Sequence, residues 1–259
     1  MPPLIRVEPL TPGASAVVLN RAERRNALSI DLLDQFCAAI NGLEQDRDQR
    51  VIVLRGDGPV FCAGLDLSEA RDDSLVERSA SGVAEALRRL RDTSLISIAA
   101  VQGGAYAGGA GLMAACDIVV AADDARIGFP EARRGLLPAL ISEPLKNRVR
   151  EGDLRYLLLT GDIVTASEAH HAGLVQRVVP SEGLMGEAER IAGLILEGGP
   201  ETIRRTKGLL NQMYAPPAYV AGDAMSKVHL SARRSDEARE GLAAFIEKRA
   251  PWWSRERSK

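Results

Sequence analysis

The sequence predicts an α/β fold in which buried strands alternate with helices, and three observations support this prediction. First, continuous apolar runs of strand length occur at residues 51–56, 96–101 and 118–122, as expected for strands that are buried on both faces. Second, helical segments lie between these runs, an amphipathic one at 75–91 and a small-residue one at 108–116. Third, the two kinds of segment alternate along the chain, which favours a parallel or mixed sheet over an all-β architecture.

The composition is that of an ordinary globular protein. Of its 259 residues, 46% are hydrophobic and 26% are charged. The formal net charge of −2 argues against a nucleic-acid binder held by bulk positive charge. The stretch 95–113 contains Gln102 and five glycines, so it is too polar to span a membrane, and the first residues carry no signal-peptide pattern. We therefore expect a soluble protein that binds neither nucleic acid nor membrane.

The cysteines point to a reducing compartment. Cys37, Cys62 and Cys116 are odd in number and lack the spacing of metal ligands. We expect them to be small core residues of a cytoplasmic protein, with no metal site.

The N-terminal elements follow from local signals. Residues 5–8 and 16–19 are β-leaning and are separated by a turn signal at 11–13. Ser29 is then a suitable N-cap for a helix. The apolar residues of that helix fall at helical spacing: Leu32, Leu33, Phe36 and Ile40.

The second half of the chain, from about residue 143, is predicted to be mostly helical. The best helix candidates are residues 166–172, 184–196, 200–214 and 236–248. No linker or low-complexity tract marks a domain boundary. We expect one α/β core over residues 1–195, followed by a helical region over 196–259.

Two glycine-rich turns, at residues 61–67 and 103–111, each follow a predicted strand. Glycine lets the backbone approach a ligand closely, and the helix that begins at 108 directs its unpaired N–H groups back at the turn. Three interpretations are possible. A dinucleotide or phosphate loop is disfavoured, because the G-x-G-x-x-G and G-K-[S/T] spacings are absent. Tight helix packing and an oxyanion hole both remain open from the turn alone.

Several segments together resemble the crotonase (enoyl-CoA hydratase/isomerase) superfamily. They occur in the order and at the intervals typical of that family, at residues 21–29, 61–66, 100–111, 115–118, 129–131 and 241–249. The resemblance implies a crotonase-like spiral of repeated ββα units followed by a C-terminal helical trimerisation region. It also implies an acyl-CoA thioester substrate. By the same resemblance, the two oxyanion N–H groups belong to Leu65 and Gly108.

The resemblance leaves the acid/base chemistry incomplete. Hydratases of this family commonly use two glutamates, whose positions fall on Gly111 and Glu131 here. Glu131 alone can act as general acid and base if burial raises its pKa. The competing interpretations of Glu131 are a surface carboxylate beside Arg133 and Arg134 and an acid at a helix start after Pro130. His170 and His171 match a helical stretch without a catalytic role in the family, so we expect them to be structural.

Three functions remain open at this point. The first is an enoyl-CoA hydratase with Glu131 as general acid/base, and the second is a Δ3-Δ2-enoyl-CoA isomerase in which Glu131 carries the proton. The third is a non-catalytic acyl-CoA-binding homologue. Ala139 replaces a glycine that is usual after the preceding proline, which should reshape the acyl pocket.

The resemblance also suggests how CoA is held. Arg24 or Arg25 would reach the phosphates, and Ala63 and Asp66 would lie along the adenine and pantetheine path. The C-terminal candidates, which in this family reach a neighbouring subunit's CoA, are Phe245 and Lys248. No separate cofactor is expected, since CoA is part of the substrate. The expected assembly is a homotrimer or a dimer of trimers.

Overall fold

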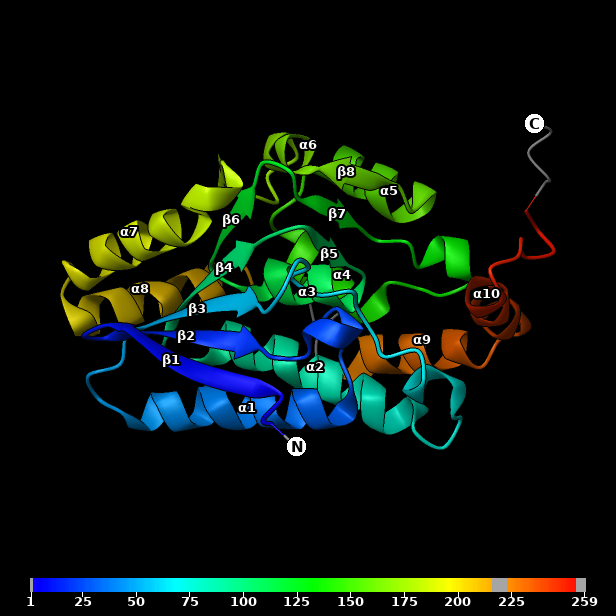
Figure 1. Ribbon diagram of the computed structural model, residues 1–259, viewed down its shortest axis with the longest axis horizontal. Helices are drawn as coiled ribbons and strands as arrows, with labels where there is room; N and C mark the ends of the chain where they lie inside the picture. The colour runs from blue at the N-terminus through cyan, green and yellow to red at the C-terminus, as the bar shows by residue number, and fades with distance from the viewer. Residues whose placement is uncertain (1, 216–222, 255–259) are drawn as a thin grey trace.

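A six-stranded mixed sheet forms the centre of the protein. The computed structural model describes residues 2–215 and 223–254. In the large sheet the strand order is β1-β2-β3-β4-β6-β9, and β5, β7 and β8 form a second, smaller sheet (Figure 1). The strands span Ile5–Thr11, Ala14–Leu19, Val51–Gly56, Ile96–Val101, Gly104–Tyr106, Ile118–Ala122, Arg126–Gly128, Ile163–Thr165 and Arg177–Val179. This arrangement confirms the predicted α/β class.

The central strands are parallel and buried. β1 pairs with β2 in antiparallel orientation, whereas the pairs β2–β3, β3–β4, β4–β6 and β6–β9 are all parallel. Val53 in β3 pairs with Ala16 on one side and Ile98 on the other, and all three are fully buried. Burial on both faces explains why these strands appear in the sequence as continuous apolar runs.

Helices from both halves of the chain cover this sheet. Helix α1 (Ile30–Gln45) packs against β1 and β2, and α2 (Val76–Asp92) packs against α1. Ser29 caps α1 as predicted, because its hydroxyl accepts a hydrogen bond from the N–H of Leu32 at 3.3 Å. Helix α7 (Leu184–Leu196) lies against β3, β4 and β6.

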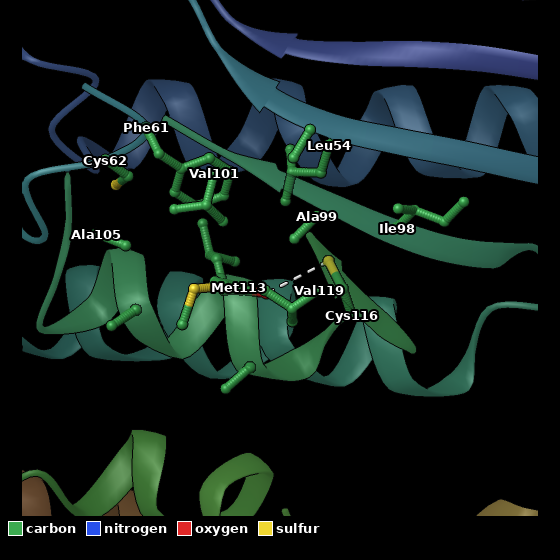
Figure 2. Close-up of a cluster of buried hydrophobic side chains, with 14 of the residues drawn as sticks. Leu54, Phe61, Cys62, Ile98, Ala99, Val101, Ala105, Met113, Cys116 and Val119 are labelled. Carbon is green, nitrogen blue, oxygen red and sulfur yellow. Dashed lines mark hydrogen bonds between the residues drawn. The ribbon is translucent and has the colours of Figure 1, made fainter. Parts of the chain in front are cut away.

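Between the central strands and α3 (Gly108–Ala115), a dry core contains two of the three cysteines. Figure 2 shows Leu54 and Val101 from the sheet and Met113 of α3 in one buried cluster, which also contains Cys62 and Cys116. Burial raises the pKa of both thiols to about 12, so they stay protonated and unreactive. The prediction that these two are core residues is confirmed; Cys37 is only half-buried.

The second half of the chain is less purely helical than predicted. It contains the strands β8 and β9, and the first half contains β5 and β7, none of which were predicted. Each has only three residues, too few to show a period, and each exists because a neighbouring strand pairs with it. The helices of this half are α4 (Ala139–Lys146), α5 (Glu151–Thr160), α6 (Ala166–His171), α7, α8 (Pro200–Met213), α9 (Asp223–Arg233) and α10 (Asp236–Glu247).

The C-terminal helices close over the first part of the fold. Lys207 of α8 is buried and donates hydrogen bonds to the carbonyls of Leu90 and Leu95 and to Asp117. Helix α9 packs against α2 and α4, and α10 packs against the short 3₁₀ helix η3 (Ala132–Arg134) (Figure 1). The division into 1–195 and 196–259 stays a prediction, and its residues 216–222 and 255–259 lie outside the described part. Within the described ranges, the helices are too short or too polar to cross a membrane.

Candidate active site

The two glycine-rich turns meet each other in space. Gly64 has a φ of +90°, and a Cβ at this position would lie 2.8 Å from the carbonyl oxygen of Tyr106 and 3.6 Å from the nitrogen of Gly108. Only a glycine allows the two backbones to come this close without a shift. The turn after β3 therefore lies directly against the start of α3.

Leu28 orients the first turn. Its N–H donates to the carbonyl of Gly64 at 2.8 Å, and its carbonyl accepts from the N–H of Asp66 at 3.1 Å. In an extended segment successive N–H groups point to opposite sides, so the N–H of Leu65 points away from Leu28. Leu65 lines a pocket on that other side.

Ala107 sets the direction of the second turn. Its φ of 49° and ψ of −123° are rarely adopted by residues with a side chain, and its N–H is held by the carbonyl of Gly128 at 2.9 Å. This conformation starts α3 at Gly108, which lines the same pocket as Leu65. Within the described part of the chain, neither the N–H of Leu65 nor that of Gly108 donates a hydrogen bond. The pair can therefore hold an anionic oxygen.

Glu131 supplies the carboxyl group of this pocket. It follows β7 at the start of η3, is only 8% exposed, and its Oε2 has no hydrogen-bond partner among the described residues. Burial raises the pKa of Glu131 to about 7, although the positive charge of Arg134 partly opposes this rise. A carboxyl group with this pKa both accepts and releases protons near neutral pH. The alternative of a surface carboxylate is thereby contradicted.

The space that a second glutamate side chain would need, beside Gly111, is filled by Ile141. Gly111 lies in α3, and a Cβ at this position would be 2.4 Å from Cγ2 of Ile141 in α4. Ile141 therefore occupies the space that a side chain at 111 would need. On this side the pocket is lined by apolar residues: Leu136, Leu137, Pro138, Leu140 and Ile141.

Three further polar residues line the pocket and were not predicted as site residues. Arg134 comes from η3, and His229 and Arg233 come from α9. The guanidinium of Arg134 lies 3.9 Å from the ring centroid of Phe245, a cation–π contact. Burial, together with the charge of Arg233, lowers the pKa of His229 to about 4, so its imidazole is neutral. The i, i+4 spacing of His229 and Arg233 could have placed them on one helix face, but it could not show what that face meets.

Four of the residues predicted to hold CoA do not line this pocket: Arg24, Arg25, Ala63 and Asp66. Arg24 and Arg25 are exposed, and the carbonyl of Arg25 accepts from the N–H of Ala63 at 3.0 Å. Asp66 is paired with Arg21 and Ser68, and both its N–H and its carbonyl are bonded within the chain.

The remaining predicted contacts lie near the pocket or on the surface. Ala139 is buried, and its two neighbours in the chain line the pocket. Phe245 contacts the lining residue Arg134, and Lys248 is exposed at the end of α10. His170 is bonded to the carbonyl of Val175 at 2.7 Å, away from this pocket. The structure thus brings together Leu65, Gly108 and Glu131, while the CoA contacts stay predictions.

Among the described residues, two backbone N–H groups without acceptors line the same pocket as one buried carboxyl group, and groups of these kinds can transfer a proton and hold an anionic oxygen. The family model for enoyl-CoA hydratase/isomerase matches residues 12–256, so the chain belongs to this family.

Individual relatives agree with this assignment. A protein from Thermus thermophilus is 37% identical over 245 residues, which cover 92% of this chain and 96% of the relative. The enoyl-CoA hydratase EchA19 of Mycobacterium tuberculosis is 34% identical over 241 residues, covering 91% of each chain. The crystal structure of an enoyl-CoA hydratase from Mycobacterium avium superposes with a TM-score of 0.88 at 32% identity, covering 98% of this chain and all of the other.

Proposed function

We propose that this protein is an enoyl-CoA hydratase that adds water across the double bond of a 2-enoyl-CoA thioester. The observation that carries the proposal is the pocket itself, in which Glu131 lies with the free N–H groups of Leu65 and Gly108. The hydratases among its relatives support the same reaction.

In this mechanism the thioester carbonyl oxygen accepts hydrogen bonds from Leu65 and Gly108. The carboxylate of Glu131 takes a proton from water while the water oxygen bonds to C3, and the C2–C3 π electrons move onto the thioester oxygen. The two N–H groups stabilise the resulting enolate. Glu131 then returns its proton to C2, so both parts of the water molecule are in the 3-hydroxyacyl-CoA product. A pKa of about 7 suits both steps.

The isomerase alternative is favoured by the contact between Ile141 and Gly111. This contact leaves no room for a second carboxyl group, which water addition commonly uses in the family. With one carboxyl group, Glu131 would remove a proton from C2 of a 3-enoyl-CoA and return it at C4. The same N–H groups would hold the dienolate between the two transfers, and no water would be consumed.

One assay separates these reactions. The protein is incubated with a 2-enoyl-CoA and, separately, with the 3-enoyl-CoA of the same length, and the products are analysed by mass spectrometry and NMR. Hydration adds the mass of one water to the 2-enoyl ester, whereas isomerisation moves the double bond at constant mass. CoA-ester binding without turnover of either substrate would identify a non-catalytic homologue instead.

A pair of variants tests the role of Glu131. Glu131→Gln keeps the size of the side chain and removes the acid/base function, so turnover should fall by about 10²–10⁴-fold. Glu182→Gln, on the exposed 3₁₀ helix η4 (Ser181–Gly183), is the matched control and should keep full activity. Full activity of Glu131→Gln would exclude both mechanisms.

The proposed assembly is a homotrimer or a dimer of trimers in the cytoplasm. Large exposed apolar side chains on α5 and β8 support self-association: Tyr156, Leu159 and Ile163. The three cysteines are free, two of them buried, which suits a reducing compartment. Light scattering should give three or six times the mass of one chain, and a monomer at micromolar concentration would contradict the assembly.

A further inference from the structure

Arg233 is a buried cation in the pocket that lacks part of its hydrogen bonding. The residue is 9% exposed, and its Nη2 donates to the carbonyl of Ala70 at 2.9 Å. Its Nη1 is buried and has no acceptor among the described residues. A buried guanidinium with an unpaired N–H costs free energy unless an acceptor is supplied. A ligand in the pocket can supply it, because Arg233 lines that pocket.

The charges around Arg233 leave the pocket with an excess of cations. Arg134 is a second cation, and His229, one turn before Arg233, is neutral and adds no negative charge. Glu131 is the single carboxyl group among the described lining residues, and its raised pKa makes it only partly charged near neutral pH. Asp73, the acid whose charge acts on Arg233, is exposed. The pocket therefore suits a ligand with a negative charge of its own.

Arg233 lies on a different element from Arg24 and Arg25, the residues predicted to reach the CoA phosphates. Arg24 and Arg25 lie at the exposed surface beside Ala63. Arg233 is carried by α9, which packs against α2 and α4. These helices also provide apolar lining residues: Ala80, Val83, Leu140 and Ile141. An apolar lining suits the hydrocarbon part of an acyl chain, so a charge at Arg233 would belong to the acyl group.

We propose that the acyl group of the substrate ends in a carboxylate and that the guanidinium of Arg233 binds this carboxylate. The planar guanidinium offers parallel N–H groups that match a carboxylate. The inference rests on the proposed acyl-CoA site, and it defines the substrate class as monothioesters of unsaturated dicarboxylic acids. Arg233 is then a specificity-determining residue, and Glu131 still carries out the proton transfers.

Matched substrates test this specificity. Kinetics are measured with 2-enoyl-CoA esters of five and six carbons, each with a methyl end and with a terminal carboxylate. The wild-type protein should favour the carboxylated ester in kcat/KM by at least about tenfold. Arg233→Met should lower kcat/KM for the carboxylated ester by about 10–100-fold and change that of the neutral ester by less than about threefold. Arg233→Lys keeps the charge and should fall between the two.

Two outcomes would overturn the proposal. One is a wild-type preference for the neutral esters. The other is an equal loss on both kinds of ester in Arg233→Met, which would mean that Arg233 binds a CoA phosphate. Circular dichroism of each variant shows whether it is folded. If Arg233→Met does not fold, the wild-type preference and Arg233→Lys decide the question.

A binding experiment keeps this inference distinct from the proposed hydration. Calorimetry compares adipoyl-CoA with hexanoyl-CoA, which are saturated and cannot be hydrated, on wild-type protein and on Arg233→Lys. Tighter binding of adipoyl-CoA that is weakened in the variant supports the carboxylate site even if no hydration is detected. Equal binding of both esters to wild-type protein contradicts it even if the enzyme is a hydratase.

Discussion

Cγ2 of Ile141 lies 2.4 Å from the point where a side chain at Gly111 would begin. The two residues belong to α4 and α3, which pack against each other. Ile141 thus fills the space that a side chain at 111 would need. A glycine at 111 and an isoleucine at 141 are therefore expected to depend on each other.

Gly111→Ala should destabilise the protein by about 1–3 kcal/mol, because the new Cβ overlaps Ile141 and the core must shift. This loss opposes the gain of up to about 1 kcal/mol that alanine brings to a helix. Gly208→Ala in α8, where nothing lies within 4 Å of the added Cβ, is the control and should stabilise slightly. Urea denaturation measures both. A second change, Ile141→Ala, should remove the overlap, so the double variant should lose less than the sum of the single losses.

The stability contributed by Glu131 should decrease as the pH rises. Burial raises the pKa of Glu131 to about 7, compared with about 4.3 for an unfolded chain, so between these values the folded state keeps a proton that the unfolded state releases. The contribution is full below about pH 4.3 and is lost as the pH rises through 7, by roughly 4 kcal/mol in total.

Glu131→Gln lacks the titrating carboxyl group, so its stability has no such pH dependence. Its free energy of unfolding should therefore rise relative to that of the wild-type protein from pH 5 to pH 8.5. Urea denaturation at both pH values gives the difference. Glu182→Gln, with its exposed side chain, should follow wild-type protein at both. A constant difference between Glu131→Gln and wild-type protein would show that the carboxyl group is not buried as described.

The pH–rate profile should report the same group. Proton abstraction requires the carboxylate form of Glu131, so kcat/KM should rise with pH and level off above an apparent pKa of about 7. The steady-state rate is measured from pH 5 to pH 9 at substrate concentrations below KM. A midpoint near pH 4.5 would mean that Glu131 is ordinary in the free enzyme or is not the base.

Gly64→Ala should separate the oxyanion hole from general stability. A Cβ at φ +90° and 2.8 Å from the carbonyl of Tyr106 should push the two turns apart, lowering kcat/KM by about 10²–10³-fold. Gly13→Ala has nearly the same backbone strain, with φ +87°, but lies in the turn between β1 and β2. It should cost stability and leave kcat/KM unchanged. Equal kinetic losses in both variants would show that strain alone is responsible.

Much of the large sheet follows from local signals in the sequence. The strands at 51–56, 96–101 and 118–122 and the helix at 184–196 have the predicted boundaries, because continuous apolar runs and clear helical spacing are properties of single segments. The predicted turn at 11–13 begins one residue too early, because β1 extends to Thr11. The pairing of β1 with β2 is irregular between Pro9 and Thr11. The three-residue strands could not be predicted, because pairing partners define them.

The sequence by itself determined the family, the two turns that carry Leu65 and Gly108, and the single glutamate at 131, since these depend on residue type and order. Only the tertiary structure decided that Glu131 is buried enough to titrate near neutral pH, that Ile141 fills the space beside Gly111, and that Arg233 faces the pocket. The physical reason is distance along the chain: burial and packing depend on helices separated by tens of residues or more, and no local pattern records which of them meet.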